Sequence, residues 1–302
     1  MISVKNKRAI AAARAGRNWQ SAATDLKHAD TLFPRTFASL TYWWDGFLSG
    51  GRIVDVSAAG VLRQHEQDNW TDIATLSAAT GVQQGPYDAD TEGNVLYDIW
   101  NWPDHSRNSF VFNFDNITGL AARLKGGPRV NFNGSPTMGG STGRTTNYVG
   151  PAGKTLADWI ANNQFTAYLV GKAGLNSAAS RILWFGDTGG FWGMGTITPA
   201  ATNWIGLVSD NTGDKQLQVA ASGNPEILEW FFTGGVQHMS VNGGADNTLS
   251  ANNVNSVASA LRLNGRWNTE LACALIFKTA LSAQDRQAMR YWLGKRFGIT
   301  TS

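Results

Sequence analysis

The last forty residues constrain the fold of this chain more than any other segment. Two apolar stretches, 260–265 and 271–277, predict short strands separated by a turn. A helix is predicted to begin after Ser282, because Ser282 and Asp285 have the spacing of a capping box. Apolar residues then continue at helical spacing until Gly298, which suits a helix stop. This pattern predicts a β-sandwich with one short helix packed on it.

Composition favours an all-β fold with a large core. Only 16% of the residues are charged, 34 are glycine and 13 are tryptophan. Few charges and many glycines suit a chain with many tight turns, and the tryptophans supply apolar volume. Because β-sandwiches often form one domain of about 200–250 residues, one main domain is expected.

Short strands with turns between them are predicted along most of the chain. The expected strands lie at 40–44, 109–114, 129–134, 165–171, 181–186, 204–208, 217–220, 229–232 and 236–241. Asn242 and Gly243 then form the strongest hairpin signal. Segment 138–153 is rich in Gly, Ser and Thr and predicts a surface loop, whereas 155–160 predicts one helical turn. Regular short strands of this kind are typical of a sandwich or a jelly roll.

The first residues form a basic arm. We expect 1–38 to be an N-terminal arm with a helix at 4–15, and 39–302 to be the sandwich, with an insertion at 47–99. The formal charge of the whole chain is +3, and residues 1–17 carry five cations and no acidic residue. The arm therefore accounts for the basic character of the chain. Such an arm is expected to dock on a partner, and nucleic acid is the less favoured ligand. The five cations of the arm are Lys5, Lys7, Arg8, Arg14 and Arg17.

Membrane insertion and secretion are not expected. No run approaches the roughly 20 apolar residues of a transmembrane helix. Arg14 and Arg17 interrupt the weakly apolar N-terminal stretch, so no signal peptide is predicted. A single cysteine, Cys273, excludes an internal disulfide framework and is predicted to be a small buried residue.

Catalytic and metal-binding motifs are not evident. Glu226 and Glu229 are three residues apart, so on a strand they would face opposite sides, whereas retaining glycosidases need two carboxyl groups about 5 Å apart. The four histidines are scattered, so no metal site or other cofactor is predicted. Loop calcium is conceivable but is not placed, because its candidates are first of all turn residues. These candidates are Asp187, Asp210, Asp214 and Asp246.

Tryptophans are the remaining candidates for binding. Most of them are expected in the core, but two lie in sequence contexts that predict exposure. Trp192 is in a glycine-rich stretch, and Trp267 follows a predicted turn. Exposed Trp faces stack on sugars or anchor protein interfaces.

Several segments resemble one domain family in their order along the chain. They are 40–46, with an aromatic pair before Asp45; 102–106, which reads Trp-Pro-Asp-His-Ser; 130–134; 165–172; and the C-terminal pattern described above. Together they resemble the laminin-G-like, concanavalin A-like jelly-roll domains of phage virion proteins.

This resemblance implies a two-sheet concanavalin A-like jelly roll and a role without catalysis. The expected role is a structural protein of a bacteriophage virion, in the head decoration or in the tail or fibre, that docks on other virion proteins. Assembly in the host cytoplasm, location in the virion and a homo-oligomeric state are expected with it. The alternative is a lectin-like module that binds a host glycan, and a polysaccharide-degrading enzyme is a less favoured third.

Overall fold

The computed structural model describes residues 33–45, 146–173, 180–185, 192–197, 203–254, 261–265 and 270–302, apart from 152, 162 and 211. Between 46 and 145 it describes residues 106–108 and 132–133 and the backbones of the strands. The predicted arm cations and Trp267 lie outside the described residues, as does the predicted helix at 4–15. The arm and domain boundaries therefore stay predictions.

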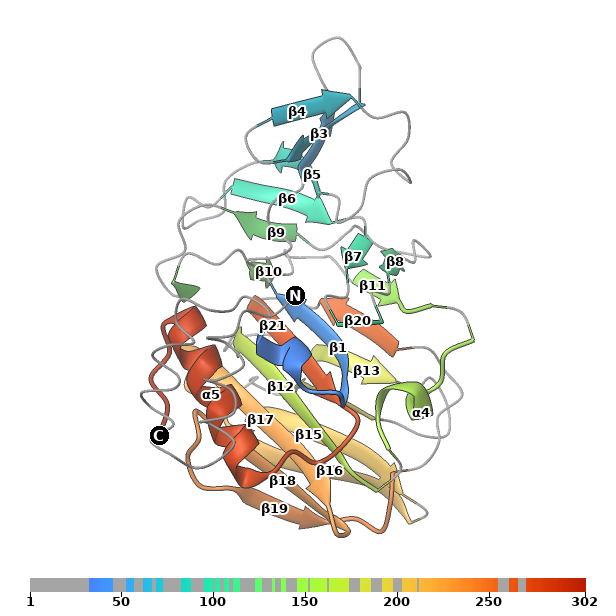
Figure 1. Ribbon diagram of the computed structural model, residues 1–302, viewed down its shortest axis with the longest axis vertical. Coiled ribbons are helices and arrows are strands. Elements are labelled where there is room, and N and C mark those ends of the chain that lie inside the picture. The colour runs from blue at the N-terminus through green and yellow to red at the C-terminus, as the bar shows by residue number, and fades with distance from the viewer. Residues whose placement is uncertain are drawn as a thin grey trace.

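Two sheets form the body of the molecule, which confirms the predicted all-β sandwich (Figure 1). Nearly all strand pairs are antiparallel, and β2 with β5 is the one parallel pair among the described strands. The 13-stranded sheet has the order β19-β18-β17-β12-β21-β10-β9-β6-β5-β2-β3-β4, with β1 also paired to β21. The 8-stranded sheet has the order β16-β15-β14-β13-β20-β11-β8-β7.

Strands of the 13-stranded sheet come from both ends of the chain. Those that build its sandwich half are β1 (Leu40–Asp45), β12 (Phe165–Lys172), β17 (Pro225–Thr233), β18 (Val236–Val241), β19 (Asn247–Ser250) and β21 (Glu270–Phe277). Those that carry the sheet away from the sandwich are β2 (Ile53–Val56), β3 (Leu62–Glu66), β4 (Asn69–Asp72), β5 (Gln83–Tyr87), β6 (Val95–Ile99), β9 (Arg123–Gly126) and β10 (Thr137–Gly139). The region 47–99, predicted as an insertion, thus holds five strands of this outer part.

The 8-stranded sheet covers the inner face of the first. Its strands are β7 (Asn101–Pro103), β8 (Val111–Phe114), β11 (Thr146–Val149), β13 (Ser180–Phe185), β14 (Trp192–Ile197), β15 (Asn203–Asp210), β16 (Gly213–Ala220) and β20 (Leu261–Gly265). One predicted feature is wrong here: the Gly-, Ser- and Thr-rich segment 138–153 holds β11 and most of β10 rather than loop alone. Backbone pairing overrides composition, since β11 hydrogen-bonds to β20 and β8 on its two sides.

Strand β21 is the centre of the first sheet. One of its edges pairs with β12 along most of its length. Its other edge is shared end to end by two strands, β1 opposite residues 273–277 and β10 opposite residues 270–271. All eight residues of β21 are buried, so this strand belongs to the core on both faces.

Three short helical elements complete the described fold. They are the 3-10 helix η1 (Phe33–Thr36), α4 (Leu156–Trp159) and α5 (Ala283–Phe297). Helix α5 lies along the outer face of the 13-stranded sheet (Figure 1). Its N-cap is the predicted one, because the Ser282 side chain accepts from the Asp285 N–H at 3.1 Å. It ends at Gly298, whose φ of 70° suits glycine, as expected.

Two apolar clusters hold the layers together. The inner cluster lies between the sheets and includes Phe165, Trp192 and Trp230. The outer cluster lies between the 13-stranded sheet and α5, and includes Trp43, Trp292 and Phe33 of η1. Both draw on alternate residues of β12, β17 and β21, which is the period-2 pattern of a strand buried on both sides.

Candidate functional site

A buried carboxylate anchors the middle of α5 to the sheet. Glu229 of β17 is 1% exposed and accepts hydrogen bonds from the Tyr168 hydroxyl at 2.8 Å and from Arg286 Nε at 3.2 Å. Arg290 Nη1 lies 2.9 Å from both oxygens of Glu229. Burial, with the Glu229 charge beside it, raises the pKa of Tyr168 well above its ordinary range, so its hydroxyl stays a donor.

A second buried carboxylate anchors the C-terminal end of the same helix. Asp45, at the end of β1, is fully buried and accepts from Arg296 Nε at 2.6 Å and Arg296 Nη2 at 3.0 Å. This fork geometry is the strongest form of an arginine–carboxylate pair. Cys273 lies opposite Asp45 in the β1–β21 register, and burial raises the pKa of its thiol well above the usual value. Cys273 is buried, as the sequence predicted, and the raised pKa disfavours the reactive thiolate form.

A third buried carboxylate, that of Glu226, faces the other way. Glu226 accepts from Trp204 Nε1 at 2.7 Å and from the Ser222 N–H at 2.9 Å, whereas Glu229 points toward α5. The two carboxylates lie on opposite faces of β17, as their spacing predicted. Each is engaged in structural hydrogen bonds, so this pair does not form a glycosidase site.

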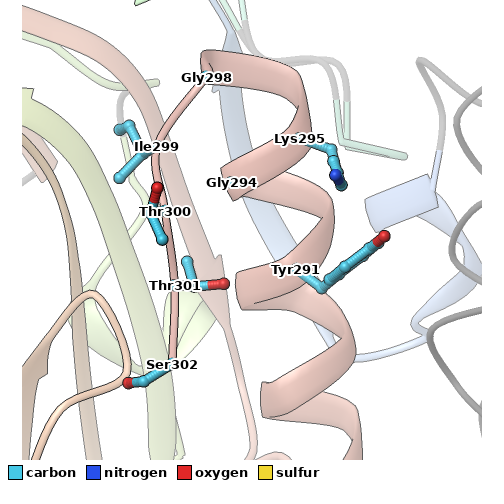
Figure 2. Close-up of a pocket in the computed structure, with 8 residues that line it drawn as sticks. All are labelled: Tyr291, Gly294, Lys295, Gly298, Ile299, Thr300, Thr301 and Ser302. Carbon is cyan, nitrogen blue, oxygen red and sulfur yellow. The ribbon is translucent and has the colours of Figure 1, made fainter.

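An open groove lies along the outward side of α5. It has a volume of about 400 Å³ and is lined by residues of the helix and of the C-terminal segment that runs back beside it. Figure 2 shows Tyr291 and Lys295 on one side of the helix, and residues 299–302 on the other side. The groove is lined by Tyr291, Gly294, Lys295, Gly298, Ile299, Thr300, Thr301 and Ser302.

The C-terminal segment is fixed in place by its backbone. The Ile299 N–H donates to Gly294 O at 2.9 Å, and the Ser302 N–H donates to Asn242 O at 2.9 Å, just after β18. Gly294 is required for this approach, because a Cβ there would lie 2.6 Å from Ile299 O. The wall formed by 299–302 is thus set by hydrogen bonds at both of its ends.

Charge in the groove comes from one side chain. Helix α5 carries four cations, and three of them, Arg286, Arg290 and Arg296, bind the buried carboxylates described above. The fourth, Lys295, is exposed, and its Nζ lies 5.5 Å from the centroid of the Tyr291 ring. The groove therefore combines an aromatic ring, one ammonium group, hydroxyls and backbone polar groups. None of its lining side chains is a carboxylate.

The expectation that Trp192 is exposed is wrong. It begins β14 and is 0% exposed, with its ring centroid 5.4 Å from that of Phe165, 5.7 Å from Phe185 and 5.1 Å from Trp230. Gly193 and Gly195, which follow it, belong to β14 in the 8-stranded sheet rather than to a surface loop. Trp184, Trp204 and Trp230 are also buried, as predicted.

Within the described residues, no group of three or more His, Cys, Asp or Glu side chains is arranged to hold a metal ion. Of the calcium candidates, Asp210 is engaged in hydrogen bonds within the protein. Its carboxylate accepts from the Thr212 hydroxyl and N–H at 2.7 Å each and from the Asn252 N–H at 3.0 Å. These bonds lower its pKa to about 2. No helix among those described is long and apolar enough to cross a membrane.

Sequence reasoning missed the groove itself. Tyr291 and Lys295 are four apart on the predicted closing helix, so they share a face, which was the available signal. The other wall depends on the chain turning back at Gly298 and on a hydrogen bond to Asn242, and both are set by tertiary structure.

Comparison with known proteins assigns no family. No protein-family model matches the chain, and no curated protein matches it. Solved structures that it resembles include the binding domain of botulinum neurotoxin DC in complex with rat synaptotagmin II, at 10% identity and a TM-score of 0.48. That match covers 64% of this chain and 49% of the other. The botulinum neurotoxin serotype D binding domain matches at 13% identity and a TM-score of 0.45, covering 63% and 47%. The chain therefore spans about half the length of these structures, at values too low to transfer a ligand.

Proposed function

We propose that this chain is a non-catalytic binding module that serves as a structural protein of a bacteriophage particle, in the head decoration or in the tail or fibre. The observation that carries the non-catalytic part is the use of the buried carboxylates. Asp45, Glu226 and Glu229 each hold structural elements together, and none is presented to a ligand. The phage part is supported by the family resemblance of the sequence and by its basic arm.

The attachment point of the arm supports docking on neighbouring subunits. Phe33 in η1 packs against Trp292 of α5, with ring centroids 6.0 Å apart, and against Phe37 at 5.4 Å. Residue 33 is therefore fixed on the outer face beside α5. Whatever precedes it begins from a rigid point, which suits an arm that reaches a partner protein.

Removal of the arm tests this proposal. Particles assembled with a chain lacking residues 1–17 are expected to contain far fewer copies than particles with the intact chain, as counted by quantitative mass spectrometry. A matched variant replaces Lys5, Lys7, Arg8, Arg14 and Arg17 with Gln and keeps the length. Native mass spectrometry of the free protein checks the expected homo-oligomer. Normal incorporation of both variants would exclude docking through the arm.

A glycan-binding role in host attachment is the second candidate. The observation that favours it is the groove beside α5, which presents an aromatic ring and hydroxyl groups on a rigid support. Trp192 cannot serve this role where it lies, because it is buried. Trp267 stays a prediction outside the described residues. A glycan array with the purified chain tests this role, and the absence of any bound glycan would contradict it.

A further inference from the structure

We propose that the N-terminal arm folds back on its own chain, and that residues 4–15 pack as a helix against the outward side of α5. This inference goes beyond the function proposed above, because it gives the arm a binding surface on its own subunit. Three observations carry it: the partial burial of the outward residues of α5, the point at which the arm joins the fold, and the residue pattern of the arm.

The outward side of α5 is partly covered. Gln284, Gln287, Tyr291 and Lys295 follow helical spacing and form a stripe opposite the residues that face the outer cluster, here called the outward stripe. Helix α5 is the outermost described helix on this side of the sandwich (Figure 1). Of the four residues, Lys295 is exposed and the other three are half-buried. Gln284 and Tyr291 also take part in interactions beyond those given above. The stripe of a helix without a neighbour is fully exposed, so this partial burial indicates a further segment against α5.

The arm joins the fold beside this stripe. The ring centroid of Phe33, in η1, lies 6.0 Å from that of Trp292. Figure 2 shows Tyr291 and Lys295 on the side of α5 where η1 lies, away from residues 299–302. The chain that precedes Phe33 therefore starts next to the outward stripe. Helix α5 has 15 residues and is about 22 Å long, and extended residues span about 3.3 Å each, so residues 16–32 can connect η1 to any point along it.

The arm has an uncharged stripe that suits a helix partner. In a helix over 4–15, Asn6, Ala9, Ile10 and Ala13 have the spacing i, i+3, i+4 and i+7, so they share one face. The cations of the segment fall outside this face. A helix of this length is marginal in water by itself, so packing against α5 supplies the stability that it lacks.

The two stripes match in length and in the size of their side chains. A helix over 4–15 would be about 18 Å long, close to the length of α5 from Gln284 to Lys295. Tyr291 packs at the rim of the outer cluster and is the large side chain of its stripe, whereas the arm offers small alanines, which let two helices approach closely. The arm cations stay in solvent in this arrangement and remain available to a partner protein. Because the arm covers part of Tyr291, it competes with a saccharide for that ring.

Cross-linking of the intact chain tests where the arm lies. A lysine-reactive reagent is applied to a dilute mixture of unlabelled and isotope-labelled protein, and the linked peptides are identified by mass spectrometry. We expect links from Lys5 or Lys7 to Lys295 within single isotopic forms. Lys154 is the reference, because it is partly exposed and lies just before α4, on the other side of the sandwich from α5 (Figure 1). Links from the arm to Lys154 should be far fewer.

Two matched substitutions in the arm test the contact face. Ala13→Glu places a carboxylate on the uncharged stripe, whereas Ala11→Glu makes the same change on the opposite side of the expected helix. Tryptic cleavage after Arg8 reports the open form of the arm, because proteases cleave segments that have unfolded locally. We expect Ala13→Glu to speed this cleavage by about tenfold, since its carboxylate would be buried, and Ala11→Glu to change it by less than about twofold. Synthetic peptides with the same changes give the intrinsic cleavage rates.

Tyr291→Ala makes the corresponding change on α5. It should also speed cleavage after Arg8 by about tenfold and reduce the links to Lys295. Its melting temperature shows whether the variant is folded. If it is not, the arm pair still decides, because Ala11 and Ala13 lie outside the two apolar clusters.

The outcomes separate this inference from the functions proposed above. Links between unlabelled and labelled chains alone would place the arm on a second copy and overturn the inference. Equal linking to Lys295 and Lys154, or equal cleavage of the wild-type protein and both arm variants, would show that the arm has no binding surface on α5. Either result leaves docking in the particle to be decided by the arm deletion. Conversely, links to Lys295 together with normal incorporation of the deleted chain would support this inference and exclude docking through the arm.

Discussion

The two apolar clusters of the molecule are built on different principles. The inner cluster joins the sheets through aliphatic side chains and through aromatic rings such as Phe165, Trp192 and Trp230. Its one carboxylate described above, Glu226, accepts from Trp204 Nε1. The outer cluster joins α5 to the sheet and contains two buried carboxylates, Asp45 and Glu229, that bind arginines of the helix. The packing of these rings positions the two sheets against each other. The arginine–carboxylate pairs fix the position of α5 along the 13-stranded sheet. Burial drives both associations, but in the outer cluster the carboxylates also specify position.

The largest effect is expected from breaking the inner cluster. Trp230→Ala removes a fully buried side chain that contacts both Phe165 and Trp192. The change should lower the free energy of unfolding by about 3–5 kcal/mol, because it combines lost burial with a cavity. Urea unfolding measured by fluorescence and circular dichroism checks it. A loss below about 1 kcal/mol would mean that the sheets do not depend on this ring contact.

A somewhat smaller effect is expected from Glu229→Gln in the outer cluster. The variant keeps the volume but leaves Arg286 and Arg290 without their buried anion. We expect the free energy of unfolding to fall by about 3 kcal/mol. Hydrogen exchange should show α5 opening before the inner strands. If both regions opened together, the helix would not be a separately held layer.

A change of about 1 kcal/mol is expected from Tyr168→Phe, which deletes the hydroxyl that donates to Glu229. In the Glu229→Gln background the same change should cost less, because the partner charge is gone. A double-mutant cycle by chemical denaturation measures this coupling. Strict additivity would show that the hydroxyl does not contribute through Glu229.

The helix cap gives a comparable or smaller effect that is independent of either cluster. Ser282→Ala removes the acceptor for the Asp285 N–H and should cost about 1 kcal/mol. Ser282→Asp is the matched control, since aspartate also caps and should restore most of the loss. Thermal unfolding of the three proteins checks the order. A Ser282→Asp protein as unstable as Ser282→Ala would argue against capping as the cause.

The smallest effect is expected in the pH dependence of stability that Asp210 contributes. The pKa of Asp210 is lowered from 3.8 to about 2, mainly by hydrogen bonds from Thr212 and Asn252. Its charged form therefore contributes stability at neutral pH, and this contribution is lost as the pH falls through about 4 to about 2. The melting-temperature difference between the wild-type protein and Asp210→Asn should shrink over that range. A difference that stays constant down to pH 2 would contradict this assignment.

Local patterns predicted much of this fold, and long-range pairings limited the rest. The capping pair at Ser282 and the hairpin at Asn242–Gly243 are short-range signals, and the structure confirms both, with positive φ at each turn residue. Asp45 reads as a turn residue in sequence, yet it is buried because Arg296, 251 positions away, binds it. Trp192 reads as exposed beside glycines, yet Phe165 and Trp230 of the facing sheet pack against it. Neither partner can be seen within a local window.

The central place of β21 has a consequence for the order of synthesis. This strand pairs with β1, β10 and β12 and contributes buried side chains to both clusters, but it is made after all of them. As the chain leaves the ribosome, β1 and β12 emerge without the strand that separates them. The sandwich half of the 13-stranded sheet therefore closes only when nearly the whole chain is available, and until then β1 and β12 present open strand edges that are prone to wrong pairing. Folding of this protein is expected to be largely post-translational, with pulse-labelled nascent chains staying protease-sensitive until β21 is released.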